Sequence, residues 1–370
     1  MGMLLGGLLG RNRPSPPFAA SPLAPRTLRV DAIRRETADV VTLVLRDPVG
    51  RAIKFSPGQY FTVLVSVGGE TVRRAYSASM PQGEGEHAAL LALTIKRIPA
   101  GRVSNFLNDN LRVGDTLEVI GPQGNFVVPR LAPPPQELVL VAGGCGITPL
   151  MCIARAHLRN ELNARVSLIY GNRRREDIIF HQALIDLQRD HEHQLAVIHV
   201  LGEPPAAWNG RVGILDRHRV AQELDTLNPS PGTHYFACGP VPMLVEVRAA
   251  LAARGVPETH VHEERFVRPS PLAQPTPCAG TPQAVTIRRG GVSQVIRVKP
   301  GQSILEAGLE SGLAMPFSCT MGGCGACKLR VVDGQVDMDE PNCLSPAERA
   351  DGFVLACVGR PRGLVTLEIP

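Results

Sequence analysis

The stretch 317–331, FSCTMGGCGACKLRV, has three cysteines separated by four and then two residues, with glycines packed between them. A fourth cysteine, Cys357, follows in VLACVGRP and completes a set with Cys319, Cys324 and Cys327. Four thiolates from one short loop and one later segment can converge only on a compact object, so the loop has to wrap closely around it. The glycines at 322, 323 and 325 reach backbone conformations closed to other residues and allow main-chain N–H groups to approach the sulfurs.

Two kinds of centre use four cysteines. Structural zinc sites usually have two close cysteine pairs that hold the metal from two sides. The C-x4-C-x2-C…C spacing is instead that of plant-type [2Fe–2S] centres. Three ligands on one loop therefore favour an iron–sulfur cluster, with zinc as the alternative, and Cys343 lies outside the spacing and is expected to be an ordinary thiol.

Composition indicates a folded protein of two or three domains. The chain has 370 residues, of which 44% are hydrophobic and 20% charged, and a formal net charge of +5. The basic residues are scattered, whereas nucleic-acid binding requires them on one face, so we expect no nucleic-acid partner. Nine cysteines, an odd number with no export signal, indicate a reducing compartment, the cytoplasm, and no disulfide framework.

The amino terminus carries the longest candidate for a membrane contact. MGMLLGGLLG has about ten apolar residues, short of the roughly 18 to 20 that cross a bilayer. It also lacks the positive start and cleavage site of a secretory signal. We expect residues 1–26 to form a flexible tail, with weak attachment to a membrane or partner as the alternative.

Two proline-rich stretches divide the chain. RLAPPPQE (130–137) cannot continue a helix or central strand and is expected to be a short connector. RPSPLAQPTPCAGTPQ (268–283) is longer and is expected to act as a semi-rigid tether. The predicted parts are the tail 1–26, domains 27–132 and 133–268, the linker 269–283 and a domain 284–370.

Each predicted domain has its own hydrophobic rhythm. Residues 27–132 contain short alternating runs such as YFTVLVSV and LLALTIKR, typical of an antiparallel sandwich or barrel. Residues 133–268 contain continuous apolar runs such as ELVLVAGG and RVSLIYGN between helical segments, which indicates an α/β domain with a parallel sheet covered on both faces. Residues 284–370 begin with two strands about a Gly-Gly turn, followed by a helix.

The segment 284–370 resembles a plant-type ferredoxin domain, on the evidence of its cysteine loop, hairpin and helix. The resemblance implies an α+β fold of the β-grasp type and a one-electron carrier. A cluster takes electrons singly while a nicotinamide gives two as hydride, and a flavin can do both. A flavin site is therefore expected upstream.

RRAYSAS (73–79) resembles the R-x-Y-S flavin motif of the ferredoxin–NADP reductase superfamily. The resemblance implies a β-barrel flavin domain in which Arg74 pairs with a flavin phosphate, Tyr76 stacks on the isoalloxazine and Ser77 hydrogen-bonds near N5. GRVSNFLND (101–109) resembles the segment whose helix start receives the flavin pyrophosphate. FAD is preferred to FMN by analogy with relatives of this domain order. The other positions assigned to flavin are Ala75, Thr94, Lys96, Gly101, Val103, Ser104 and Phe266.

VLVAGGCGITPLMCIA (139–154) combines a buried strand, a glycine turn and a helix begun by Pro149, which can present N–H groups to a pyrophosphate. It resembles the G-G-x-G-I-T-P loop of the same superfamily, with a tight structural turn as the alternative. YFACGP (235–240) resembles the C-G-P motif beside the nicotinamide, where Cys238 positions the ring; its alternative is a small buried thiol. The residues assigned to the nucleotide are Gly143, Gly144, Gly146, Ile147, Thr148, Pro149, Cys238, Gly239 and Pro240.

HEERF (262–266) resembles the acid-x-aromatic close of the nucleotide domain and implies that Glu264 and Phe266 lie near the flavin. The resemblance thus gives Ser77, Cys238 and Glu264 as catalytic residues. After the second buried strand the chain has Asn172, Arg173 and Arg174, and acids follow only later. An acid directly after that strand would bind ribose hydroxyls and repel a 2′-phosphate. The arginines favour NADPH, and NADH remains open.

The order of flavin, nicotinamide and ferredoxin parts resembles the hybrid reductase components of bacterial oxygenases. The family implies an NAD(P)H oxidoreductase that passes electrons through FAD and a [2Fe–2S] cluster to a partner oxygenase or hydroxylase. We expect a monomer, and the proline-rich tether suggests that the ferredoxin part swings between the flavin and the partner. Two alternatives stay open. The acceptor could be another metalloprotein, such as a hybrid-cluster protein, or the chain could be a redox sensor without turnover.

Overall fold

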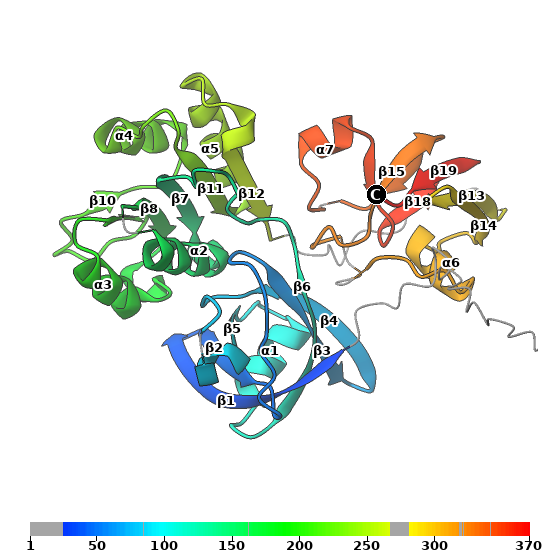
Figure 1. Cartoon of the computed structure of the whole chain (residues 1–370), viewed down its shortest axis with the longest axis horizontal. Coiled ribbons are helices and arrows are strands. Elements are labelled where there is room, and N and C mark those ends of the chain that lie inside the picture. The colour runs from blue at the N-terminus through cyan, green and yellow to red at the C-terminus, as the bar shows by residue number, and fades with distance from the viewer. Residues whose placement is uncertain are drawn as a thin grey trace, which may run out of the picture.

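The computed structural model describes residues 25–83, 85–161, 163–266, 281–317, 320, 322–340 and 342–370. The chain forms three bodies, each built around its own sheet (Figure 1). The predicted tail as far as residue 24, the linker residues 269–280 and Cys319 lie outside the described residues. Within the part of the chain that is described, no helix has the length and apolar character needed to span a membrane.

The first body is a six-stranded sheet in which all the pairings are antiparallel, in the order β4-β3-β6-β1-β2-β5. The strand runs predicted from alternation are confirmed, and their apolar faces pack inward: Leu43, Val63 and Leu93 are fully buried. A bridge between Ala78, just after β4, and Leu93 joins the two edge strands. The elements are β1 (Arg26–Thr37), β2 (Val40–Arg46), β3 (Tyr60–Val67), β4 (Glu70–Ser77), η1 (Gly85–Ala89), β5 (Leu90–Lys96), α1 (Arg102–Asp109) and β6 (Thr116–Gln123).

The second body has the predicted parallel sheet, in the order β10-β9-β8-β7-β11-β12. Helices α2 and α3 cover one face, and α4 and α5 cover the other. The helix after the glycine turn begins at Ile147, not at Pro149, because Gly146 already serves as its N-cap. The elements are β7 (Glu137–Gly143), η2 (Gly144–Gly146), α2 (Ile147–Asn160), β8 (Arg165–Asn172), η3 (Arg175–Asp177), α3 (His181–Asp190), β9 (Leu195–Leu201), β10 (Arg211–Val212), α4 (Arg217–Leu227), β11 (His234–Gly239), α5 (Val241–Ala253), η4 (Glu258–His260) and β12 (Val261–Arg265).

The third body has a five-stranded sheet, β14-β13-β19-β15-β17, and a small β16-β18 pair. The predicted hairpin turns at Gly290 and Gly291, both of which have positive φ. The predicted helix is fixed at its start by a capping box between Ser303 and Glu306. The elements are β13 (Gln283–Arg289), β14 (Val292–Val298), α6 (Ile304–Glu310), β15 (Lys328–Asp333), β16 (Val336–Met338), α7 (Pro346–Ala350), β17 (Phe353–Leu355), β18 (Gly359–Pro361) and β19 (Val365–Glu368).

The first two bodies share apolar contacts. Cys152 on α2 is buried in the core of the antiparallel sheet, while Val40 and Phe126 of the first body pack into the core beneath α2. Burial of side chains from both sides holds the two bodies in a defined relation. The residues at the ends of β4, β7 and β11 can therefore form one site.

A buried carboxylate secures the start of the parallel sheet. Glu137, at the first position of β7, accepts hydrogen bonds from Ser230 N (2.8 Å), Ser230 Oγ (2.6 Å), Thr233 Oγ1 (2.9 Å) and Arg165 Nη2 (2.8 Å). Burial alone would raise the pKa of Glu137, but the hydrogen bonds from Ser230, Thr233 and Arg165 lower it overall. The ionised form is therefore the one that stabilises the fold.

Replacement of this carboxylate tests the network. Glu137→Ala leaves the buried Thr233 hydroxyl without this acceptor and removes the bonds from Ser230 and Arg165, and we expect it to lower the free energy of unfolding of the second body by about 2 kcal/mol. The single tryptophan of the chain, Trp208, lies in this body, so urea unfolding followed by its fluorescence reports the change.

The effect has a defined pH dependence. A folded-state pKa below the ordinary value of 4.5 gives stability that is present above about pH 4.5 and is lost as the pH falls through the folded-state pKa. The difference between wild type and Glu137→Ala should therefore shrink in acid. Glu192→Ala, at an exposed position in the turn before β9, is the control and should unfold like the wild type. Equal unfolding of all three proteins at pH 7 would contradict the assignment.

Candidate functional site

The three residues predicted to be catalytic lie together. Ser77, the last residue of β4, donates a hydrogen bond from Oγ to Glu264 Oε2 at 3.2 Å, across the boundary between the first two bodies. Glu264 on β12 is the register partner of Cys238 on the neighbouring parallel strand β11. The ends of three strands from two sheets thus place a hydroxyl, a carboxyl and a thiol at one point.

Burial keeps this point uncharged at neutral pH. It raises the pKa of Glu264 to about 8, and the nearby Cys324 adds to the rise while the hydrogen bond from Ser77 opposes it. It also raises the pKa of Cys238 far above that of an ordinary thiol, with further contributions from Glu264 and Cys145. Cys238 is therefore a neutral thiol, which agrees with a role in positioning and not with that of a nucleophile.

The two predicted nucleotide motifs are in direct contact. A Cβ on Gly146 would lie 2.0 Å from the carbonyl oxygen of Cys238, so only glycine allows the turn to approach β11 this closely. Added Cβ atoms on Gly143 and on Gly239 would both meet Met243 on α5. The structure thus brings the residues of 143–149 and of 238–240 to one edge of the sheet.

The turn before α2 has the properties of an anion site. Gly146, its N-cap, contributes no side-chain cap, so the first N–H groups of α2 have no side-chain acceptor at that position. Gly144 has a φ of +52°, and a Cβ on it would meet nothing within 4 Å, which leaves the outer side of the turn open. Free N–H groups and the helix dipole favour a pyrophosphate here, so the residues present fit a dinucleotide.

The predicted flavin residues line β4 and the start of α1. Arg74, Ala75 and Tyr76 follow one another on β4, where burial raises the pKa of the Tyr76 hydroxyl. Gly101 is the N-cap of α1 and has no side chain to cap it. The following Val103 and Ser104 are buried, and the Ser104 hydroxyl accepts a hydrogen bond from Ile98 N. The start of α1 therefore offers a second set of N–H groups to a phosphate.

Of the predicted flavin residues, two have side chains that bond to other residues of the protein and a third has an exposed side chain. The Thr94 hydroxyl donates to Ser79 Oγ at 2.8 Å in a buried chain of hydroxyls. Lys96 Nζ forms an ion pair with Asp39 at 2.8 Å. Phe266 is 39% exposed and directly precedes the residues from 267 that are not described. Their assignment to a flavin remains a prediction.

Three of the four predicted cluster ligands can be located. Cys327 and Cys357 interact through their thiols, and the N–H of Gly322 donates to Cys357 Sγ at 3.2 Å. These two hydrogen bonds lower the pKa of Cys357, and the charge of Cys324 acts on both thiols. Gly322 and Gly325 have positive φ, as expected for a loop that turns its N–H groups toward sulfur.

The cysteine loop fits an iron–sulfur cluster in its chemistry. Thiol side chains and a main-chain donor to sulfur are the groups that such a cluster requires. Among the described residues, which exclude Cys319, no group of three or more His, Cys, Asp or Glu side chains is arranged as a metal site. The ligand set therefore remains a prediction for this loop. Cys343 packs beside it, with its N–H bonded to Gly322 O, and burial raises the pKa of Cys343 to about 12.

Sequence reasoning missed Glu203. It follows β9 and holds both arginines that were expected to bind the nucleotide: Arg173 Nε donates to Oε1 at 2.7 Å and Arg174 Nε to Oε2 at 2.9 Å. These hydrogen bonds lower the pKa of Glu203. The only signal in the sequence was an acid just after the third buried strand, at the same sheet edge as the arginines. Asn172 at the end of β8 interacts with the buried hydroxyl of Tyr170.

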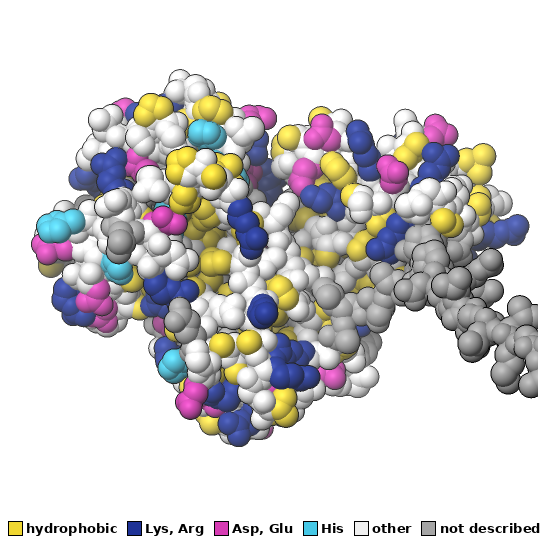
Figure 2. Space-filling view, in the orientation of Figure 1, with side chains coloured by type: hydrophobic (Ala, Val, Ile, Leu, Met, Phe, Trp, Pro, Cys, Tyr) yellow, Lys and Arg dark blue, Asp and Glu magenta, His cyan; other side chains and the backbone are white. Residues whose placement is uncertain are grey.

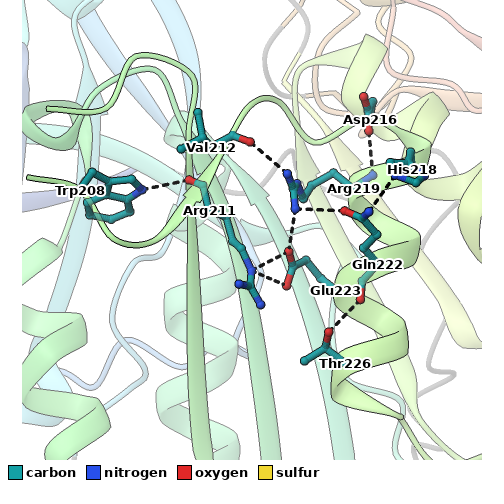
Figure 3. A network of polar contacts seen from close by, with 9 residues as sticks. All are labelled: Trp208, Arg211, Val212, Asp216, His218, Arg219, Gln222, Glu223 and Thr226. Atoms are coloured by element: carbon teal, nitrogen blue, oxygen red, sulfur yellow. Dashed lines mark hydrogen bonds and ion pairs between the residues drawn. The ribbon is translucent and has the colours of Figure 1, made fainter. Parts of the chain in front are cut away.

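A hydrogen-bond network supports the segment that follows Glu203 (Figure 3). Trp208 Nε1 donates to Arg211 O, Arg211 pairs with the buried Glu223 of α4 at 3.0 Å, and Arg219 donates to both Glu223 Oε1 and Val212 O. Because α4 is packed on the sheet, these contacts restrict the segment between β9 and α4. Figure 3 also shows the same network continuing through Asp216, His218, Gln222 and Thr226 along α4.

On the side drawn in Figure 2, Lys and Arg are interspersed with Asp and Glu over all three bodies.

Three family models match the chain in the predicted order. They are described as an oxidoreductase FAD-binding domain, matching residues 27–128, an oxidoreductase NAD-binding domain, matching 140–249, and a 2Fe-2S iron-sulfur cluster binding domain, matching 287–362. The chain is thus an oxidoreductase with FAD, NAD(P)H and [2Fe–2S] as its cofactors.

Similar proteins cover nearly the whole chain. It is 33% identical over 341 residues to a subunit of the 1,2-phenylacetyl-CoA epoxidase of Escherichia coli (strain K12), and the match covers 90% of this chain and 94% of that protein. It is 31% identical over 360 residues to the glycine betaine monooxygenase reductase subunit of Chromohalobacter salexigens, and this match covers 92% and 94%. Among solved structures, phthalate dioxygenase reductase, described as modular for electron transfer from pyridine nucleotides to [2Fe–2S], matches with a TM-score of 0.61 and 26% identity, and covers 93% and 98%.

Release of the two arginines from Glu203 tests their role in nucleotide choice. Glu203→Gln removes a negative charge that would repel a 2′-phosphate and frees both guanidinium groups to bind it. We expect the ratio of kcat/KM for NADPH to kcat/KM for NADH to rise about fivefold, a change of the size that exposed ion pairs produce. Steady-state reduction of ferricyanide with each nucleotide gives the ratio.

The matched control breaks an exposed ion pair elsewhere. Asp225→Asn removes the 2.6 Å contact with Arg254 on the far helices of the same body and should leave the ratio unchanged. An unchanged ratio in Glu203→Gln as well would show that Arg173 and Arg174 do not contact the ribose end of the nucleotide.

Proposed function

The chain belongs to the family of oxygenase reductase components that join FAD-binding, NAD-binding and 2Fe-2S domains, and from this we propose that it passes electrons from NAD(P)H through FAD and a [2Fe–2S] cluster to a partner oxygenase. Each NAD(P)H oxidised to NAD(P)+ yields one proton and two electrons, and the electrons reduce two one-electron acceptors. The contact of Ser77 with Glu264, beside Cys238, carries the proposal because it joins the predicted flavin and nicotinamide residues at one point.

We propose that the second body orients the nicotinamide. The turn 143–146 and the start of α2, with Ile147, Thr148 and Pro149, bind the pyrophosphate through main-chain N–H groups. Cys238, Gly239 and Pro240 would contact the nicotinamide ring when the nucleotide is bound. The neutral thiol of Cys238 and the protonated carboxyl of Glu264 exclude charge and water from the place where hydride leaves.

We propose that the first body holds the flavin. Arg74 pairs with a phosphate through its planar fork, and the start of α1 at Gly101 binds the pyrophosphate. Tyr76 supplies a ring for stacking, and Ser77 lies at the reactive edge with its hydroxyl oriented by Glu264. Lys96, Thr94 and Phe266 complete the assigned set.

We propose that Cys319, Cys324, Cys327 and Cys357 are the cluster ligands, with Gly322 N–H as a donor to the last of them. The finer descriptions of the fold are part of the same proposal: a barrel closed through the Ala78–Leu93 bridge, and a β-grasp for the third body. The same proposal includes the domain limits 27–132, 133–268 and 284–370, a monomeric state, a cytoplasmic location and a weak membrane contact through the N-terminal tail.

Two cysteine variants test the cluster and the electron path together. Cys357→Ala removes a predicted ligand, and the protein purified without air should lose the roughly two irons and two labile sulfides per chain of a [2Fe–2S] centre. It should keep NAD(P)H-dependent reduction of ferricyanide, which a flavin supports alone, and lose reduction of a one-electron protein acceptor such as cytochrome c. Iron and sulfide analysis, visible absorbance and both assays make the measurement.

Cys343→Ala is the control, because this buried thiol lies beside the same loop but outside the ligand spacing. It should retain iron, sulfide and both activities. Zinc in place of iron in the wild type would refute the cluster, and iron retained in Cys357→Ala would refute this ligand assignment while leaving the reductase function intact.

The pKa of Glu264 predicts a pH profile. Because its pKa is about 8, Glu264 is protonated at pH 7 and ionises above pH 8, which places a negative charge beside Ser77 and Cys238. We expect the rate of flavin reduction by NAD(P)H to fall about tenfold between pH 7 and pH 9. In Glu264→Gln, whose side chain stays neutral, the profile over this range should be flat. Stopped-flow absorbance measures the rate, and the same decline in both proteins would assign it to another group.

A further inference from the structure

Tyr60 connects the third body to the first. It is the first residue of β3, and its side chain is 5% exposed. Its hydroxyl donates a hydrogen bond to the backbone oxygen of Cys324 at 2.9 Å. The two residues are 264 positions apart, so this contact depends entirely on how the third body lies against the antiparallel sheet.

A second contact joins the same two bodies at the other side of the cysteine loop. The guanidinium carbon of Arg73 lies 5.2 Å from the centroid of the Phe317 ring, within the range of a cation–π interaction. Phe317 and Cys324 border the segment that contains Cys319. Both contacts come from β3 and β4, which are neighbouring strands. The residues on either side of Cys319 therefore contact the same pair of strands.

The position of Tyr60 links this contact to the site. Tyr60 and Ser77 are directly opposite in the pairing of β3 with β4, so their side chains lie on the same face of the sheet. One side chain of this pair reaches Cys324 of the third body, and the other reaches Glu264 of the second. All three bodies therefore meet at a single cross-strand pair.

The environment of Tyr60 suits a fixed anchor. A Cβ on Gly124 would lie 3.0 Å from the Tyr60 ring, so the absence of a side chain there lets the ring pack against the chain directly after β6. A ring held by packing, on a strand paired on both sides, presents its hydroxyl in one direction. The acceptor is a main-chain oxygen, so the bond fixes the path of the loop without using a cysteine sulfur.

We propose that Tyr60 is a positioning residue that docks the cysteine loop on the flavin-binding body, by hydrogen bonding the carbonyl of Cys324 beside the contact of Ser77 with Glu264. The effect of this docking on electron transfer rests on the proposed function. Electron transfer falls steeply with the distance between donor and acceptor, so a loop fixed at this pair receives electrons faster than one that is free to move away. Tyr60 sets that distance and touches neither hydride nor nicotinamide.

Tyr60→Phe is the test, because it removes one oxygen and keeps the packed ring. Loss of a neutral hydrogen bond weakens docking about fivefold. In the complete protein with its cofactors, hydrogen exchange of the amides in 322–327 should become about fivefold faster, since exchange reports the opening of this loop. After anaerobic mixing with NADH, the flavin phase should stay within about twofold of wild type, while the cluster phase slows about fivefold.

A second variant keeps the test independent of Tyr60 itself. Arg73→Gln removes the cation–π contact with Phe317 and should also accelerate exchange in the loop and slow the cluster phase, by about threefold. Tyr235→Phe, which removes a largely buried hydroxyl from β11 in the second body, is the matched control and should change neither measurement.

The outcomes separate the inference from the function on which it rests. Wild-type exchange and a wild-type cluster phase in Tyr60→Phe would overturn the positioning role while leaving the reductase function in place. A cluster that neither NADH nor NADPH reduces in the wild type would overturn the function. Faster exchange in Tyr60→Phe would then still show that the hydroxyl docks the loop.

Discussion

The cross-strand pair of Tyr60 and Ser77 is the constraint on which the arrangement of the molecule depends. Residues directly opposite in an antiparallel pair have their side chains on one face, a few ångströms apart. Here one of them bonds to the cysteine loop and the other to the carboxyl at the end of the nucleotide sheet. Three separately folded sheets are thereby brought to one point, which is what a path from hydride to single electrons requires.

The protein keeps that point free of charge. Glu264 is protonated at neutral pH and Cys238 is a thiol, because both are removed from water and lie beside each other on adjacent strands. The opposite holds at the cysteine loop, where hydrogen bonds from Cys327 and Gly322 lower the pKa of Cys357. In the same pair, the hydrogen bond to Cys357 and burial raise the pKa of Cys327, so the thiolate is favoured at only one of the two sulfurs.

The local pattern of apolar and polar residues in the sequence was sufficient to predict most strands and helices of the fold. The alternation in 27–132, the apolar runs of 133–268 and the Gly-Gly hairpin of the third body predicted strands that the structure contains, because side-chain periodicity determines which face is buried. The cysteine spacing and the glycine turn also indicated chemistry directly. The helix after that turn was predicted two residues late, since Gly146 and not Pro149 sets its start.

Contacts between distant residues could not be predicted in this way. Glu203 lies about one strand and one helix beyond the arginines that it binds, and only the adjacency of β8 and β9 brings them together. Tyr60 lay at the start of a run whose alternation predicted a strand, but its partner is in another body. Such contacts depend on the order of the strands in each sheet and on the packing of one body against another. A local sequence pattern predicts neither of these.

The strength of the contacts between the first body and the third agrees with the function expected of a one-electron carrier. A neutral hydrogen bond and a half-buried cation–π contact each stabilise an association by only about 1 to 2 kcal/mol, whereas the first two bodies share buried apolar side chains. Contacts of the size of those of Tyr60 and Arg73 are compatible with a body that docks reversibly. A one-electron carrier needs both docking and release, because it has to approach the flavin to be reduced and expose its cluster to a partner to be oxidised.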